Sequence, residues 1–197
     1  MALFVDILDV QLQVLAWGLL AVASWVALRF ARRRQGSPSL DRGFGLAFTA
    51  IGFYALVTGL WATFAWPLPS SYNIVLSDPY ALYGVAMLVL GLALVYSAGL
   101  EGPGLTISFL SISVLIYAAD IMKYGLTNEP AAAGGLFVLV GLAGLLGPLL
   151  LHGRASKWAA YVEIVLLVLA GLLSAYIGAS ATFEHTADWA KWVPFYG

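Results

Sequence analysis

Six stretches of this chain contain no Asp, Glu, Lys or Arg, and each is 18 residues or longer. They are residues 10–28, 43–77, 79–100, 102–119, 130–153 and 164–183. A helix rises about 1.5 Å per residue and the hydrocarbon core of a bilayer is about 30 Å thick, so each stretch is long enough for one crossing. The pattern predicts an all-α, polytopic membrane protein, with six transmembrane helices that form a single domain over residues 1–197.

The composition excludes several other classes of protein. Hydrophobic residues make up 62% of the chain and charged residues 10%, whereas soluble domains are roughly 45–50% apolar and about 25% charged. Nine Lys and Arg stand against ten Asp and Glu, so there is no basic surplus to bind nucleic acid, and the expected partner is the lipid bilayer. The absence of cysteine excludes disulfides, iron–sulfur clusters and cysteine nucleophiles.

The positive charges predict the orientation of the bundle. We expect the helices at Val10–Phe30, Gly43–Trp66, Pro79–Leu100, Leu105–Tyr124, Pro130–Leu151 and Trp158–Phe183. Seven of the nine basic residues then lie at the first, third and fifth connections, namely Arg29, Arg32, Arg33, Arg34, Arg42, Arg154 and Lys157. Short loops rich in Lys and Arg stay in the cytoplasm, so we expect a plasma-membrane protein with both termini outside.

Proline marks two of the predicted outer connections. Trp66-Pro67-Leu68-Pro69 and the following residues to Tyr72-Asn73 cannot continue the second helix, so we expect them to fold back as a compact outer cap. Asp78 and Pro79 are expected as the N-cap and first residue of the third helix. Glu129-Pro130 has the same pattern at the fifth helix.

These two helix starts also suggest an internal repeat. Asp78, Pro79, Ala81 and Gly84 match Glu129, Pro130, Ala132 and Gly135 at a constant offset of 51 residues. Residues 43–100 and 105–151 are therefore a possible pair of repeated hairpins, an arrangement that is common in transporters. The alternative is a chance match, because the chain is rich in Ala and Gly.

The same loops carry a resemblance to a known family. Trp66-Pro67-Leu68-Pro69 with Tyr72-Asn73-Ile74, and Tyr124-Gly125-Leu126-Thr127 before Pro130, resemble a small archaeal and bacterial membrane family catalogued as domain of unknown function nine-eight-one. The resemblance covers roughly residues 50–150 and implies no activity. A looser, topological similarity links the predicted bundle to the proton-gated urea channel and amide transporter family, which also has six helices and outer termini.

The predicted fourth helix has one polar face. Its members are Thr106, Ser113, Tyr117, Asp120 and Tyr124, at spacings of seven, four, three and four residues. Such a face is expected to point away from lipid, toward the bundle interior or another subunit. Lys123 is three residues from Asp120 and within its reach, so the two form either a structural ion pair or part of a pore.

The remaining polar residues predict no catalytic or metal site. Glu163 is expected near the inner headgroups, and the alternative is that it points inward on the face of Ala170 and Ser174. His152 and His185 lie on opposite sides of the membrane, and His185 belongs to a solvated helix end with Glu184 and Asp188. No activated nucleophile is visible, so we expect neither an enzyme nor a cofactor.

Small residues indicate where helices approach closely. Gly84, Gly91 and Ala98 recur every seven residues, and a second group comprises Gly171, Ser174, Ala175 and Gly178. These faces are either internal contacts or contacts between subunits. Two functions remain: a homo-oligomeric channel or carrier for a small neutral or weakly acidic solute, or a non-catalytic accessory subunit of a larger membrane complex, such as a respiratory one.

Overall fold

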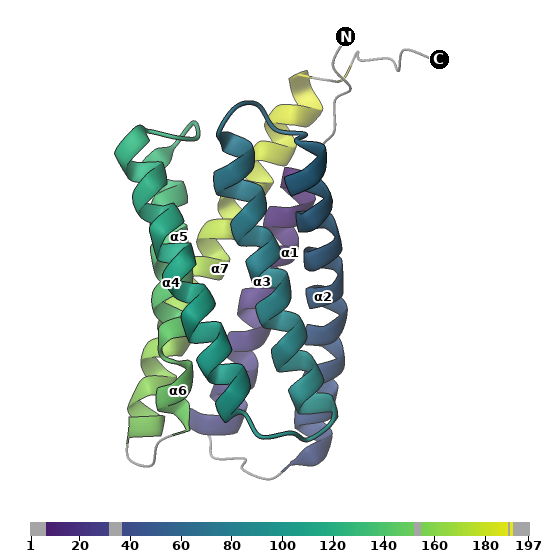
Figure 1. Ribbon diagram of the computed structural model, residues 1–197, viewed down its shortest axis with the longest axis vertical. Helices are drawn as coiled ribbons and strands as arrows, with labels where there is room; N and C mark the ends of the chain where they lie inside the picture. The colour runs from purple at the N-terminus through teal and green to yellow at the C-terminus, as the bar shows by residue number, and fades with distance from the viewer. Residues whose placement is uncertain (1–6, 32–36, 152–154, 189, 191–197) are drawn as a thin grey trace.

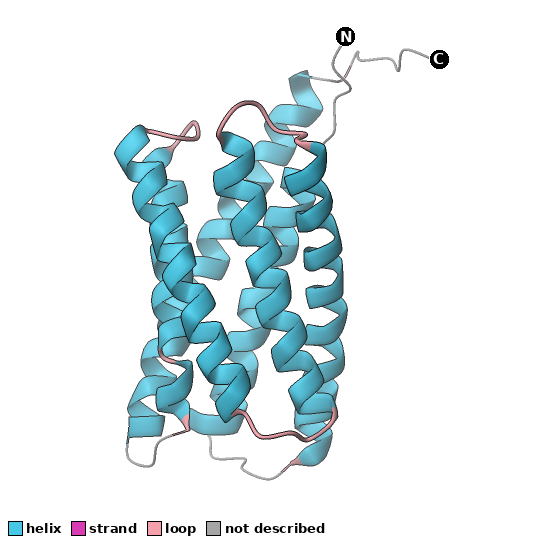
Figure 2. Cartoon of the chain, viewed as in Figure 1, coloured by secondary structure: helices cyan, strands magenta, loops and turns pink. Residues whose placement is uncertain are grey.

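The computed structural model describes residues 7–31, 37–151, 155–188 and 190, and the regular elements within them are all helical (Figure 2). They are α1 (Leu8–Val26), the π-helical η1 (Ala27–Ala31), α2 (Pro38–Ala65), α3 (Tyr72–Val95), α4 (Glu101–Tyr124), α5 (Pro130–Leu145), α6 (Gly147–Leu150) and α7 (Ala155–Asp188). Five of these spans are long and apolar enough to cross a membrane, and α5 is a shorter apolar helix of 16 residues. The chain is therefore a multi-pass helical protein, as the sequence predicted.

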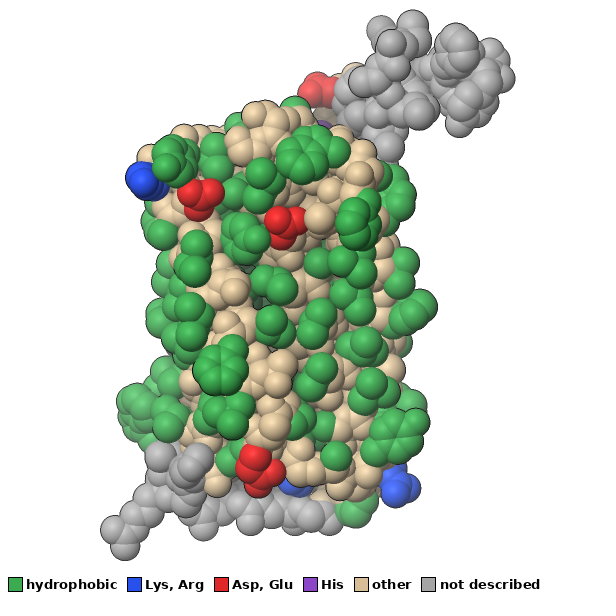
Figure 3. All heavy atoms as spheres, in the orientation of Figure 1, with side chains coloured by type: hydrophobic (Ala, Val, Ile, Leu, Met, Phe, Trp, Pro, Cys, Tyr) green, Lys and Arg blue, Asp and Glu red, His purple; other side chains and the backbone are tan. Residues whose placement is uncertain are grey.

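The long helices pack as three pairs (Figure 1). Helix α1 lies along α7, α2 along α3, and α4 along α5, while α5–α7 and α3–α4 contacts join the pairs. Figure 3 shows a face whose middle is covered by hydrophobic side chains, with charged side chains toward its two ends. The basic residues Arg32, Arg33, Arg34 and Arg154 lie outside the described residues, and the orientation of the bundle stays a prediction.

Glycine brings α2 and α3 into backbone contact. Gly45, Gly52 and Gly59 recur every seven residues on α2 and face α3, where Gly84 and Gly91 have the same spacing. A Cβ atom added at Gly84 would lie 2.6 Å from the Cα of Leu56, closer than packed side chains allow. The small residues of α3 thus form an internal contact with α2 in this structure.

A second close contact joins the first and last helices, α1 and α7. On α7, a Cβ added at Gly171 would lie 2.8 Å from the Leu20 side chain, and one at Gly178 would lie 3.0 Å from that of Leu12. Between them, the buried Ser174 hydroxyl donates a 2.8 Å hydrogen bond to the Leu12 carbonyl oxygen. The small-residue face of α7 therefore packs on α1.

The start of α3 differs from the prediction. The chain turns at Trp66 and Ser70, which both have φ of 53°, so α3 already begins at Tyr72 and Pro79 lies inside it. Asp78 is not the N-cap. Pro79 has no N–H to donate within the helix, a loss that packed membrane helices tolerate. Because Pro130 is at the start of α5, the two prolines that suggested a repeat occupy different helix positions.

Two other helix ends are also corrected. Helix α2 begins at Pro38 rather than Gly43, because the Ser37 hydroxyl caps it and because Asp41 in its first turn is neutralised by Arg29 at 2.7 Å. Helix α5 ends at Leu145 rather than Leu151, since Pro148 lacks the N–H that would continue it, and the short α6 follows.

Candidate functional site

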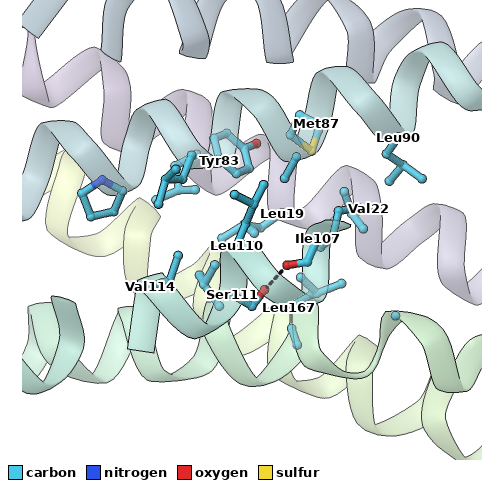
Figure 4. A pocket seen from close by; sticks show the side chains of 18 of the residues that line it. Leu19, Val22, Tyr83, Met87, Leu90, Ile107, Leu110, Ser111, Val114 and Leu167 are labelled. Atoms are coloured by element: carbon cyan, nitrogen blue, oxygen red, sulfur yellow. Dashed lines mark hydrogen bonds between the residues drawn. The ribbon is translucent and has the colours of Figure 1, made fainter. Parts of the chain in front are cut away.

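A cavity of about 160 Å³ lies between the three helix pairs, lined by residues of α1, η1, α3, α4, α5, α6 and α7. Its walls are mostly alkyl side chains, several of which Figure 4 shows pointing toward one another, among them Leu19, Val22, Met87, Leu110 and Val114. An engineered apolar cavity of about 150 Å³ stays dry and binds benzene. The cavity is therefore large enough for a small organic molecule.

Glu163 of α7 is the one charged residue among those that line this cavity in the described part of the chain. It is 6% exposed, and its Oε2 atom has no hydrogen-bond partner. Its burial agrees with the inward-facing alternative, whereas its depth relative to the inner headgroups stays a prediction. Helix α7 already begins at Ala155, so Glu163 lies about 12 Å along the helix, on the face that packs into the bundle.

Gln11 of α1 is a second buried polar group of the cavity. It is 2% exposed, and its Nε2 atom has no hydrogen-bond partner. Sequence reasoning missed this residue, although a glutamine within an otherwise apolar membrane helix is itself a signal of an inward-facing position. Ser111 of α4, by contrast, is satisfied within its own helix, because its hydroxyl donates to the Ile107 carbonyl at 2.8 Å (Figure 4).

Tyr83 of α3 reaches across the bundle to α1. Its hydroxyl is buried without a hydrogen-bond partner and lies against Gly18, where an added Cβ would overlap it. Figure 4 shows the ring of Tyr83 at the cavity wall. Gly18 therefore supplies the space that this side chain occupies.

The polar face of α4 lies beside the cavity and does not line it. Thr106 and Tyr124 are exposed, whereas Ser113, Tyr117 and Asp120 are half-buried. The α4 residues that do line the cavity belong to a neighbouring face of the helix and are Gly104, Ile107, Leu110, Ser111 and Val114. The polar face of α4 therefore does not point into the cavity, as it would if it formed a pore there.

The predicted Asp120–Lys123 ion pair is not formed among the described residues. Instead, the exposed Lys123 places its Nζ atom 4.8 Å from the centre of the Tyr124 ring. Tyr117 turns toward α3 and donates a hydrogen bond of 3.4 Å to Asp78, which also accepts one of 2.9 Å from Thr63 of α2. Asp78 therefore connects α3 to α2 and α4.

The loop between α2 and α3 is anchored by Asn73. Its side chain is fully buried and donates from Nδ2 to the Ala62 carbonyl at 3.0 Å, while Oδ1 accepts from the Leu68 amide at 3.3 Å and the Ser77 hydroxyl at 3.4 Å. These bonds tie the segment with Trp66, Pro67, Pro69 and Tyr72 to both helices.

No group of three or more potential metal ligands occurs in the portion of the chain that the structure describes. At the predicted solvated end of α7, the Nδ1 atom of His185 lies 3.0 Å from the Oδ2 atom of Asp9, which is buried on α1. His185 thus contacts the first helix instead of forming a cluster with Glu184 and Asp188.

Comparison with known proteins identifies a family to which the chain is similar. A family model described as protein of unknown function (DUF981) matches residues 1–188. No curated protein and no solved structure matches the chain. The match extends the resemblance seen in the proline loops to nearly the whole chain, and it includes Gln11 and Glu163.

Proposed function

The chain belongs to the DUF981 family of proteins of unknown function, and from its geometry we propose that it is a membrane carrier that binds a small solute in the cavity between its three helix pairs. The observation that carries this proposal is a cavity of about 160 Å³ with two buried, unpartnered polar side chains, Glu163 and Gln11. Apolar walls with a few polar groups are typical of small-molecule sites.

The size of the cavity supports a bound molecule. Its volume of about 160 Å³ is close to that of an engineered apolar cavity that binds benzene. A solute that fills the space restores the missing dispersion contacts and gives the two polar groups partners. The volume and the two polar groups therefore support a bound solute.

The walls support a binding carrier better than an open channel. A water-filled channel for small polar solutes needs polar groups along its length, and here almost every lining side chain is apolar. A wholly apolar neutral solute crosses lipid unaided, so carriage is useful for a molecule that combines an apolar body with a polar or charged group. Since one chain lines the cavity, we propose that binding needs no second subunit.

The proposal is tested by filling the cavity. Val114 lines the cavity and is buried, whereas Ile116 on the same helix is 63% exposed. We expect the purified chain in nanodiscs to bind at least one of hexanol, hexanoate and hexylamine by titration calorimetry, corrected for protein-free nanodiscs. Val114→Trp should abolish that binding and the corresponding flux in proteoliposomes, while Ile116→Trp should leave both unchanged.

The outcome separates this function from the accessory-subunit alternative. If no member of the panel binds, or if Val114→Trp binds as well as the unmodified chain, the cavity is not a solute site. Purification from native membranes in a fixed stoichiometry with other membrane subunits would then favour the accessory role.

A further inference from the structure

The wall of the cavity has one carboxyl group and no basic side chain among the described residues. Glu163 is the one ionisable acid on its wall, and no Lys, Arg or His belongs to the lining of the cavity within the described residues. The basic residues on neighbouring elements are engaged or distant: Arg29 is paired with Asp41 at 2.7 Å, and Lys157 is exposed, six positions before Glu163 on α7. The described residues therefore supply no counter-charge for this carboxyl group.

An uncompensated carboxylate selects among possible solutes. Burying an isolated carboxylate is costly unless a partner charge and hydrogen bonds compensate it. A solute with an ammonium group brings both, because it has a positive charge and three N–H donors for carboxylate oxygens. A hydroxyl brings a donor without a charge, and a carboxylate brings a second negative charge.

The rest of the wall suits the same class of solute. Trp25 lines the cavity and packs in one cluster with Ala159, Ala160 and Ile164, which flank Glu163 along α7. Its ring is held in place because Nε1 donates a 3.0 Å hydrogen bond to Asp41. Aromatic faces attract ammonium groups, more strongly when water is excluded. Leu19, Val22 and Met87 offer apolar contacts for the body of the solute.

We propose that the cavity binds small amphiphilic amines, with Glu163 as the counter-charge of the ammonium group and alkyl side chains around the apolar body. This inference rests on the proposed function, because it specifies the solute of the same cavity. It replaces the neutral or weakly acidic solute expected from the sequence with a cationic one.

The experiment compares three head groups on one alkyl chain. Hexylamine, like a lysine side chain with a pKa of about 10.4, is cationic at neutral pH. In nanodiscs, with protein-free nanodiscs as the blank, we expect hexylammonium to bind about tenfold more tightly than hexanol, and hexanoate to bind most weakly. Glu163→Gln keeps the shape of the side chain and removes its charge, so it should abolish the preference for hexylammonium.

Ser174→Ala is the matched control. Ser174 is buried on the same helix but bonds to Leu12 and does not line the cavity, so its variant should keep the order of the three solutes. If hexanol or hexanoate binds as tightly as hexylammonium to the unmodified chain, the amine inference is wrong while the solute site stands, and this comparison holds even where Glu163→Gln does not fold. If none of the three binds, the proposed function fails as well.

Discussion

Two faces of helix α3 pack in different ways. Its face toward α2 carries Gly84 and Gly91, and there the two backbones touch. Its face toward the bundle centre carries Tyr83, Met87 and Leu90, and there a cavity remains. Both faces are apolar and both are buried in the same bundle, so hydrophobicity does not distinguish them. Side-chain size does.

The physical reason lies in the solvent. Lipid tails are as apolar as leucine, so membrane helices gain little from merely leaving lipid, and they associate through close packing. Glycine lets two backbones approach until many atoms are in van der Waals contact. Long alkyl chains from several helices that meet at one centre hold the backbones apart and leave space between their ends. The α2–α3 contact is therefore closely packed and leaves no free space. The bundle centre, by contrast, has room for a solute.

The largest expected effect comes from adding one methyl group to the α2–α3 contact. In Gly84→Ala the new Cβ would lie 2.6 Å from the Cα of Leu56 and 2.8 Å from the carbonyl carbon of Ala55, and backbone atoms cannot move away singly. We expect the free energy of unfolding to fall by about 3 kcal/mol. Reversible unfolding in mixed micelles measures this change.

Gly135→Ala is the matched control, because nothing lies within 4 Å of a Cβ at Gly135 of α5. Alanine favours a helix over glycine by up to about 1 kcal/mol, so this variant should be unchanged or slightly more stable. Equal losses of stability in the two variants would show that glycine flexibility, and not close packing, is what matters at Gly84.

The polar anchor of the same hairpin gives the next largest effect. Asn73→Ala removes three hydrogen bonds and leaves the Leu68 amide without its partner, so we expect a loss of about 2 kcal/mol and faster proteolysis of the loop. Asn128→Ala, at an exposed position before α5, should change stability little. A loop whose protease resistance is unaffected by Asn73→Ala would contradict the anchoring role.

The comparison also shows what the sequence could and could not predict. The seven-residue spacing of Gly84 and Gly91 predicted a close helix contact, because that inference needs only one helix. It did not predict that the partner is α2. The sequence left two positions open for Glu163 for a related reason: the face that α7 turns inward depends on its packing against α1, which lies at the other end of the chain.

The helix ends show the same limit. The sequence predicted an all-helical, multi-pass chain, but Pro79 was interpreted as a helix start because a proline is most often tolerated there. In the structure, Asn73 and the turn at Trp66 start the helix seven residues earlier, at Tyr72. Contacts between segments, and not local preference, decide such ends.

Enlarging a residue at the bundle centre should raise the free energy of unfolding, whereas Gly84→Ala should lower it. Ala86 of α3 lines the cavity, and Ala86→Leu would place its added carbons in empty space. We expect the empty protein to gain about 1 kcal/mol of stability and to lose solute binding. Thermal unfolding with and without hexylammonium checks both parts. A destabilised Ala86→Leu variant would mean that the centre is as tightly packed as the α2–α3 contact.

The C-terminal end of α4 gives the smallest expected effect, because it takes part in neither region. Asp120 and Lys123 have the spacing of a helical ion pair, yet Lys123 lies over Tyr124 and forms no such pair in the described structure. Lys123 is also exposed, and exposed charge pairs contribute only about 0–1 kcal/mol. In a double-mutant cycle with Asp120→Asn and Lys123→Met, we therefore expect the two changes in unfolding free energy to add within about 0.5 kcal/mol. A coupling of about 1 kcal/mol or more would show that the pair forms in the bilayer, and the polar face of α4 would then help to hold the bundle together.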